Sequence, residues 1–241
     1  MIRPAPVSSR RRPAAWRSWI RRLLLGFAGF VALTLLSTLL LRVVPPPATP
    51  LMVIRGMQGM TAGRGFIIRK HWQPLADISP AMIRAVIAAE DQKFLHHFGF
   101  DFDAISKAYA NNRDGGRRRG GSTITQQTAK NVFLWPCGSY LRKGIEAYFT
   151  LLLELCWSKE RIIEVYLNIA EFGPGVYGVE SAARTYYQTA ARQLTARQAA
   201  MLAAILPSPL RWNPARPTGY LVHRQRWILQ QMHNIGPLPL H

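Results

Sequence analysis

The sequence predicts a mostly α-helical protein, in which one helical domain follows a single N-terminal helix long enough to cross a membrane. Residues 23–41 form an uninterrupted run without charge. The chain after this run carries repeated helix-start and helix-stop signals, and only residues 51–54 and 65–69 have the composition of strands. With 241 residues, 49% of them hydrophobic, the chain can bury a sizeable core.

The N-terminal run is predicted to be an uncleaved membrane anchor. As a helix, residues 23–41 would be about 28 Å long, close to the roughly 30 Å hydrocarbon core of a bilayer. A cleavable signal peptide is the competing interpretation, but its apolar segment is usually about 7–15 residues long and ends at a small-residue cleavage site. Here the run leads into Arg42 and three consecutive prolines. An uncleaved anchor is therefore favoured.

Charge predicts how this anchor is oriented. Seven arginines lie within the first 22 residues, and no acidic residue occurs before Asp77. Positive residues beside a membrane span tend to stay in the cytoplasm. We therefore expect a basic cytoplasmic segment at residues 1–22, a transmembrane anchor at 23–44 and a domain outside the cytoplasmic membrane at 45–241.

The net charge of +19 favours a polyanionic partner, which could be nucleic acid, an anionic membrane or a phosphorylated substrate. A domain outside the cytoplasm disfavours nucleic acid. An oxidising compartment would permit a disulfide between Cys137 and Cys156, although a packed free thiol is the simpler interpretation of Cys156. No cysteine and histidine spacing typical of zinc appears.

Capping signals place the helices of the domain. Ser79 and Pro80 are a good N-cap and first helical residue for a helix that runs to about Asp91. Thr195 and Gln198 fit a capping box. The remaining expected helices cover residues 102–111, about 123–131, 141–157, 159–168 with Ser158 as the cap, 196–206 ending at Pro207, and 220–234 ending before Gly236.

Three polar clusters are candidates for chemistry. Glu90 and Asp91 lie where a helix is predicted to end, although acidic pairs are unfavourable at the negative end of a helix dipole. Residues 120–131 place two glycines before a helix start, an arrangement that suits phosphate. Residues 142–146 bring two cations and a carboxylate onto one helical turn. Each cluster alone could be an ordinary solvated surface.

Taken together, these clusters resemble the peptidoglycan glycosyltransferases, lysozyme-like enzymes found alone or fused to penicillin-binding transpeptidases. The resemblance covers residues 78–214, almost the whole domain. It rests on five ordered blocks: E-D-Q-K-F-x-x-H-x-G-x-D at 90–101, G-G-S-T-I-T-Q-Q-T-A-K-N at 120–131, R-K-x-x-E at 142–146, K-E-R-I-I-E-V-Y-L-N at 159–168 with the glycines that follow it, and L-A-A-I-L-P-S-P…W-N-P at 202–214.

The resemblance implies an enzyme that polymerises lipid II into β-1,4-linked glycan strands, with inversion at the anomeric carbon and release of undecaprenyl pyrophosphate. Glu90 would be the catalytic base, and Glu146 the second catalytic carboxylate, assisting at the pyrophosphate or holding a metal. Nearby cations are expected to lower the pKa of Glu90 and so weaken it as a base, an effect that a partly apolar cleft would have to offset. The residues expected to bind substrate or its pyrophosphate are Asp91, Phe94, His97, Thr123, Gln127, Lys130, Asn131, Arg142 and Lys143.

Cofactor and location follow from the same resemblance. A Mg²⁺ or other divalent cation requirement is left open, and no organic cofactor is expected. The chain is expected in the cell inner membrane with its catalytic domain in the periplasm, where proteins of cell-wall synthesis or division are candidate partners. The sequence contains neither S-x-x-K nor K-T-G, which predicts no transpeptidase activity.

Two alternatives compete with the biosynthetic interpretation. A lytic muramidase or transglycosylase on a similar scaffold would also use a glutamate, but the cations at 130, 142 and 143 and the membrane anchor favour a pyrophosphate donor. A non-enzymatic membrane scaffold would depend on the basic residues 117–119 rather than on Glu90. For His97, a structural role in the loop after Glu90 stands equal to a role in the cleft.

Overall fold

The computed structural model describes residues 14–63, 65–113, 121–136 and 138–240. It divides into two compact units, residues 1–40 and 41–241, which are described separately. The predicted fold class is confirmed, because the described part of the chain is mostly helical, with one small sheet and one apolar N-terminal helix. Cys137 and residues 117–119 lie outside the described residues, as do the predictions made for them.

Helix α1 (Ala14–Leu41) contains the uncharged run 23–41 and ends three residues before the predicted end of the anchor at residue 44. Its segment Trp16–Leu41 is long and apolar enough to cross a membrane, and its apolar side chains, such as Leu23, Phe27 and Leu36, are largely exposed. The helix begins earlier than the uncharged run, and so it includes Arg17, Arg21 and Arg22. Arginine is a good helix former and can extend its charge toward the membrane surface.

Helix α2 (Pro50–Thr61) replaces the strand predicted at residues 51–54, and that prediction was wrong. The helix-start signal was present in the sequence: Thr49 is the N-cap, and Pro50 takes the first helical position. Met52 is fully buried, whereas Met57 and Met60 are exposed. The helix therefore places Met52 in the core and leaves Met57 and Met60 at the surface.

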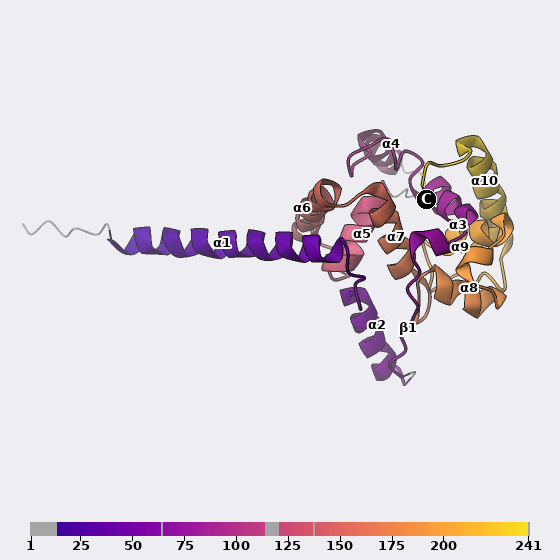
Figure 1. Ribbon diagram of the computed structural model, residues 1–241, viewed down its shortest axis with the longest axis horizontal. Helices are drawn as coiled ribbons and strands as arrows, with labels where there is room; N and C mark the ends of the chain where they lie inside the picture. The colour runs from indigo at the N-terminus through magenta and orange to yellow at the C-terminus, as the bar shows by residue number, and fades with distance from the viewer. Residues whose placement is uncertain (1–13, 64, 114–120, 137, 241) are drawn as a thin grey trace, which may run out of the picture. The chain divides into compact units, whose positions relative to one another are not determined.

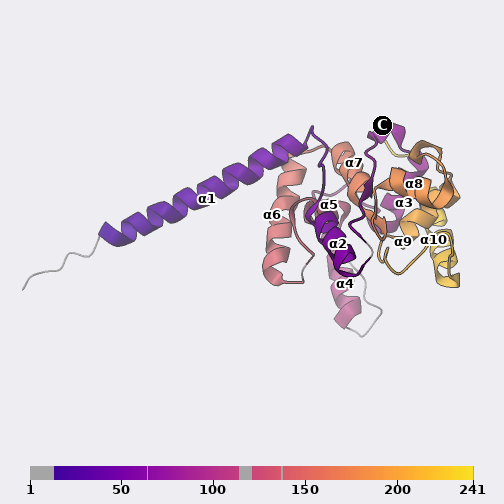
Figure 2. The same cartoon turned by 90° about the horizontal axis from the view of Figure 1, so that it is seen from below.

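The core of the second unit has two groups of helices (Figure 1). Helix α3 (Pro80–Glu90), capped by Ser79 as predicted, packs against α9 (Ala196–Ile205) and α10 (Gly219–Ile235). Helix α5 (Ile124–Phe133) packs against α6 (Tyr140–Cys156) and α7 (Lys159–Ile169). Figure 2 shows α2 beside α5, the helix that it contacts. Helix α4 (Phe102–Arg113) matches its prediction within two residues.

Capping fixes the start of helix α5. Thr123 and Gln126 form a reciprocal capping box, and the side chain of Thr123 also donates to the carbonyl of Gly99 at 2.6 Å. The sequence located this helix start to within one residue. It missed Gln126 as the partner in the box. The predicted box of Thr195 and Gln198 at the start of α9 is confirmed.

A small sheet and helix α8 (Val179–Tyr187) were not predicted. Strand β3 (Val176–Tyr177) lies between β1 (Arg69–Lys70), which is parallel to it, and β2 (Glu171–Gly173), which is antiparallel. The strand expected at residues 65–69 is present only at its last residue. Gly175, with φ +72°, makes the turn between β2 and β3, as expected of a glycine there. Short 3₁₀ turns occupy Leu75–Asp77 and Ala191–Gln193.

Candidate active site

Glu90 is the last residue of α3, and its side chain is turned inward, with only 13% of it exposed. Its Oε2 accepts a hydrogen bond of 2.9 Å from the side-chain amide of Gln127 on α5. Two helices that are distant in sequence therefore meet at this carboxylate. The structure brings together the first two clusters singled out by the sequence.

Helix α10 supplies a third neighbour that the sequence did not identify. Nη2 of Arg224 lies 3.7 Å from Oε1 of Glu90. Oε1 itself is buried and makes no hydrogen bond among the described residues, and neither does Nε of Arg224. Arg224 lies outside the five motif blocks, in the helix predicted at residues 220–234, so no local signal marked it as part of the site.

The pKa of Glu90 is raised above its ordinary value, because burial outweighs the expected lowering by neighbouring cations. Burial is the largest cause, because it disfavours the charged form. The hydrogen bond from Gln127 and the positive charges of Arg224 and Lys130 lower the pKa but do not outweigh burial. A carboxylate with a raised pKa is a stronger base, as general base catalysis requires.

Tyr166 orients the amide of Gln127. Its hydroxyl, on α7, donates to Oε1 of Gln127 at 3.3 Å, so the NH₂ group of Gln127 faces Glu90. Burial raises the pKa of Tyr166 well above its ordinary value, and the nearby charges of Glu90 and Asp91 raise it further. The hydroxyl therefore stays protonated and remains a donor. Tyr166 therefore supports the site from α7 without contacting Glu90 through a hydrogen bond of its own among the described residues.

The carboxylate of Asp91 contacts the backbone at the start of α5 and the imidazole ring of His97. Its Oδ2 accepts from the backbone N–H of Ile124 at 3.0 Å, at the start of α5, and Nε2 of His97 lies 2.9 and 3.0 Å from its two oxygens. A carboxylate at a helix N-terminus is favoured by the helix dipole. Asp91 therefore connects His97, in the loop after Glu90, to the start of α5. This connection supports the structural role considered for His97.

Phe94 and Thr123 are buried, although Thr123 also lines the pocket that opens beside Glu90. Phe94 is fully buried, with Nζ of Lys159 4.7 Å from its ring centroid. Thr123 is 2% exposed and serves as the cap of α5. Both residues hold the elements that carry Glu90 and Gln127. The full burial of Phe94 gives no support to its predicted contact with substrate, whereas the contact predicted for Thr123 stays a prediction.

The predicted cations gather around a second carboxylate. Glu146 is 2% exposed, and its Oε2 accepts from Nη1 of Arg142 at 2.8 Å while Lys143 bonds its Oε1. Lys130 lies near this group, and within the described residues its ammonium makes no hydrogen bond or ion pair. Burial lowers the pKa of Lys130, Glu146 opposes that shift, and Arg142 and Lys143 add to it.

Lys130 also connects the two carboxylates electrostatically, because its charge acts on both Glu90 and Glu146. Asn131, the next residue on α5, is half-buried and makes no hydrogen bond to either carboxylate within the described part of the chain. The structure thus brings Lys130, Arg142 and Lys143 into one cationic group and leaves Asn131 beside it. An anion that reached Lys130 would lie within the influence of both catalytic candidates.

A pocket of about 240 Å³ opens beside Glu90. Its walls come from the end of α3, from α4 and its preceding loop, and from the segment that leads into α5. The lining residues are Glu90, Asp91, Gln92, Lys93, Asp101, Ala104, Gly121, Ser122 and Thr123. The glycine and serine of the second cluster therefore face the same space as the proposed base, as a ligand-binding loop would.

The surroundings of Glu146 do not fit a metal held by the protein. Both of its oxygens already accept bonds from cationic side chains. In residues 14–63, 65–113, 121–136 and 138–240, no three His, Cys, Asp or Glu side chains gather as metal ligands would. We therefore assign no metal to Glu146, and whether the reaction needs Mg²⁺ or another divalent cation stays open.

Comparisons with known proteins support a single family. Residues 61–233 match the model of the transglycosylase family. The biosynthetic peptidoglycan transglycosylase of Caulobacter vibrioides is 54% identical over 213 residues, covering 88% of this chain and 90% of its own. Proteins of the same description from Pseudomonas putida and Bdellovibrio bacteriovorus are each 51% identical, over 90% and 92% of this chain and 92% and 88% of their own.

Proposed function

The chain belongs to the transglycosylase family and is a glycosyltransferase of peptidoglycan biosynthesis, and from this premise we propose that it polymerises lipid II into linear β-1,4-linked glycan strands. The observation that carries the proposal is the environment of Glu90. This carboxylate is buried, has a raised pKa, is held by Gln127 through one oxygen and keeps the other without a hydrogen bond.

We propose that Glu90 is the general base. Its Oε1 takes the proton from the 4-hydroxyl of the acceptor sugar, and that oxygen attacks the anomeric carbon of the donor strand. The new C–O bond forms as the bond from the anomeric carbon to the pyrophosphate oxygen breaks, so the configuration inverts. The bonding electrons leave with undecaprenyl pyrophosphate. Positioned proton transfer of this kind typically contributes about 10²–10⁴-fold to a rate.

Lys130, Arg142 and Lys143 are proposed to stabilise the leaving pyrophosphate. Negative charge accumulates on its oxygens as the glycosidic bond breaks, and fixed cations in a poorly hydrated site stabilise such charge strongly. Lys130 suits this role because no internal partner occupies its ammonium within the described residues. Arg142 and Lys143 lie on the same helix as Glu146, and ion pairs with its two carboxylate oxygens hold them in place. We assign Glu146 this positioning role in place of a catalytic one.

The membrane helix fits a substrate that is itself held in a membrane. Helix α1 is consistent with a single-pass anchor. We propose that it lies in the cell inner membrane, with residues 1–22 in the cytoplasm, 23–44 spanning and 45–241 in the periplasm. The growing strand and proteins of cell-wall synthesis or division are the proposed partners. Because this chain contains no S-x-x-K or K-T-G sequence, we propose that it does not itself cross-link strands.

Polymerisation of purified lipid II by the detergent-solubilised full chain tests this proposal. Wild type and Glu90→Gln would be compared with labelled lipid II, with Mg²⁺ or with a chelator, and the products resolved by gel. We expect lysozyme-digestible strands from the wild type only. Cleavage of preformed strands without polymer formation, by a protein shown to be folded, would instead identify the lytic activity. The chelator arm separately decides whether the reaction requires a divalent cation.

A further inference from the structure

One face of helix α10 carries two exposed aromatic rings beside the catalytic carboxylate. Tyr220, Arg224, Trp227 and Gln231 are spaced by four, three and four residues, so they lie on one side of the helix. Tyr220 is 39% exposed and Trp227 is 43% exposed. We call these four residues the α10 face. Neither the motif blocks nor the proposed mechanism assigns this aromatic pair a role.

The α10 face adjoins the active site at two points. Nη2 of Arg224 lies 3.7 Å from Oε1 of Glu90, and the side-chain oxygen of Gln231 accepts from the amide of Gln92 at 3.3 Å. Gln92 lines the pocket next to Glu90. A ligand that extends from Glu90 along α10 would therefore meet Trp227 or Tyr220 within one helical turn of Arg224.

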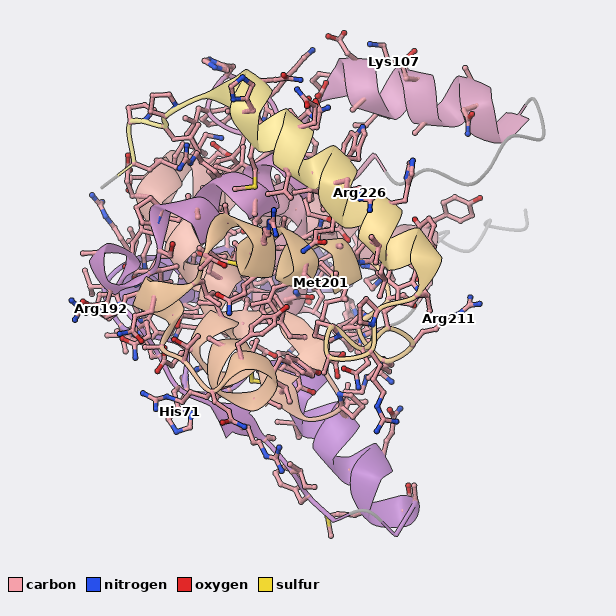
Figure 3. All side chains as sticks on the ribbon, turned by 90° about the vertical axis from the view of Figure 1, so that its right-hand side faces the viewer. His71, Lys107, Arg192, Met201, Arg211 and Arg226 are labelled. Atoms are coloured by element: carbon pink, nitrogen blue, oxygen red, sulfur yellow. The ribbon has the colours of Figure 1, made fainter. Side chains whose placement is uncertain are left out.

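The surroundings of this face are strongly basic. Residues 181–241 contain seven arginines and no acidic residue. Arg211, Arg216 and Arg226 are exposed and form no salt bridge within the described part of the chain. Figure 3 looks onto this side of the molecule, with Arg211 and Arg226 labelled. A third ring, Trp212, has its centroid 5.4 Å from that of Tyr220, which extends the aromatic surface.

Exposed aromatic rings among arginines suit a carbohydrate that carries carboxylates. The C–H face of a sugar ring is apolar and packs on an aromatic ring, while hydroxyl and carboxylate groups bond to arginine. An anionic membrane also attracts aromatic and basic residues. A membrane, however, would not account for the fact that the face is centred on Arg224, whose guanidinium reaches the reacting carboxylate and whose Nε has no hydrogen-bond partner among the described residues.

We propose that the α10 face is a binding site for the glycan strand, with a sugar stacked on Trp227 or Tyr220 and the neighbouring arginines holding carboxylates of the strand's peptides. The inference rests on the proposed function, because the strand is its substrate or product. The site would keep a strand bound between successive additions. Loss of the rings should therefore shorten the product more than it slows a single addition.

Direct binding of purified, labelled, uncross-linked strands to the full chain in detergent tests the site. We expect Trp227→Ala to bind strands about tenfold more weakly than wild type, the loss expected for one aromatic contact of about 1.4 kcal/mol. Trp227→Phe keeps a ring and should recover most of the affinity. Trp135→Ala is the matched control, because Trp135 is 49% exposed and lies outside the α10 face. Thermal unfolding of each variant establishes that it is folded.

The outcomes separate the site from the reaction. Weaker strand binding and shorter polymers from Trp227→Ala, with Trp135→Ala like wild type, support the proposal. Wild-type strand binding by a folded Trp227→Ala and Tyr220→Ala double variant overturns it while polymerisation stands. A defect confined to lipid vesicles, with strand binding in detergent unchanged, also overturns it and assigns the rings to lipid. If the wild type forms no polymer, the proposed function fails, and the binding measurement still decides the site.

Discussion

Two buried glutamates occupy opposite electrostatic environments in this protein. Glu146 has its counter-charges on its own helix, where Arg142 and Lys143 bond both of its oxygens. Among the described residues, Glu90 accepts a hydrogen bond from the neutral side chain of Gln127. Arg224 lies 3.7 Å away and forms no hydrogen bond to it. The same side chain is therefore neutralised in one place and held as a base with a raised pKa in the other. Environment, rather than residue type, separates the two roles.

The largest expected effect comes from removing the base. Glu90→Gln keeps the shape of the side chain but cannot accept a proton, so kcat for polymerisation should fall about 10²–10⁴-fold. Product gels from labelled lipid II measure this loss. Strand formation by the variant at near the wild-type rate would show that Glu90 is not the base.

Glu90→Gln should lower activity but increase the stability of the fold at neutral pH. Because the folded-state pKa of Glu90 is raised, its contribution to stability is present at low pH and is lost as pH rises through the folded pKa. Glu90→Gln should therefore raise the Tm at neutral pH and leave it little changed at low pH. A lower Tm at neutral pH would show that ionised Glu90 stabilises the fold.

Removing Lys130, whose ammonium has no hydrogen-bond or ion-pair partner among the described residues, should have the next largest effect on activity. Lys130→Ala deletes a charge-assisted contact to pyrophosphate, which is worth roughly 1.5–3 kcal/mol, or about 10–100-fold in kcat/KM. Steady-state kinetics with lipid II measure it. Lys107→Ala is the control, because this lysine is exposed on α4 and is expected to leave kcat/KM unchanged. Equal losses in both variants would indicate a general effect of net charge.

Glu146→Gln should destabilise the fold, in contrast to Glu90→Gln. It leaves Arg142, which is only 14% exposed, without its counter-charge, so unfolding free energy should fall by about 1–3 kcal/mol. Chemical denaturation of the Glu90 and Glu146 variants side by side would measure opposite signs. A Glu146→Gln variant more stable than wild type would mean that the charge of buried Glu146 destabilises the fold, as the charge of Glu90 is expected to do at neutral pH.

The smallest effect concerns pH. Gln127→Leu removes the hydrogen bond that lowers the pKa of Glu90, so the acidic limb of the kcat/KM profile should move to higher pH. Tyr166→Phe only frees the orientation of that amide and should move the limb in the same direction by less. An unmoved acidic limb in Gln127→Leu would assign that limb to a group other than Glu90.

The positions of most helices, and the region of the site, could be predicted from the sequence. Ser79 with Pro80 and Thr195 with Gln198 are local signals, because a cap bonds backbone within three residues. The same rule applies to Thr49 and Pro50, which were overlooked when residues 51–54 were assigned to a strand. The short sheet could not be predicted, because β1 pairs with a strand more than 100 residues later.

The sequence by itself determined the helical fold class, the apolar N-terminal helix, the family through its ordered motifs, and the members of the cationic group, of which Arg142 and Lys143 are adjacent on α6 and Lys130 is on α5. Only the tertiary structure decided the pKa of Glu90, the burial of Phe94 and Thr123, and the place of Arg224. Those properties depend on which helices meet around a side chain, and burial changes the cost of a charge more than its neighbours in sequence do.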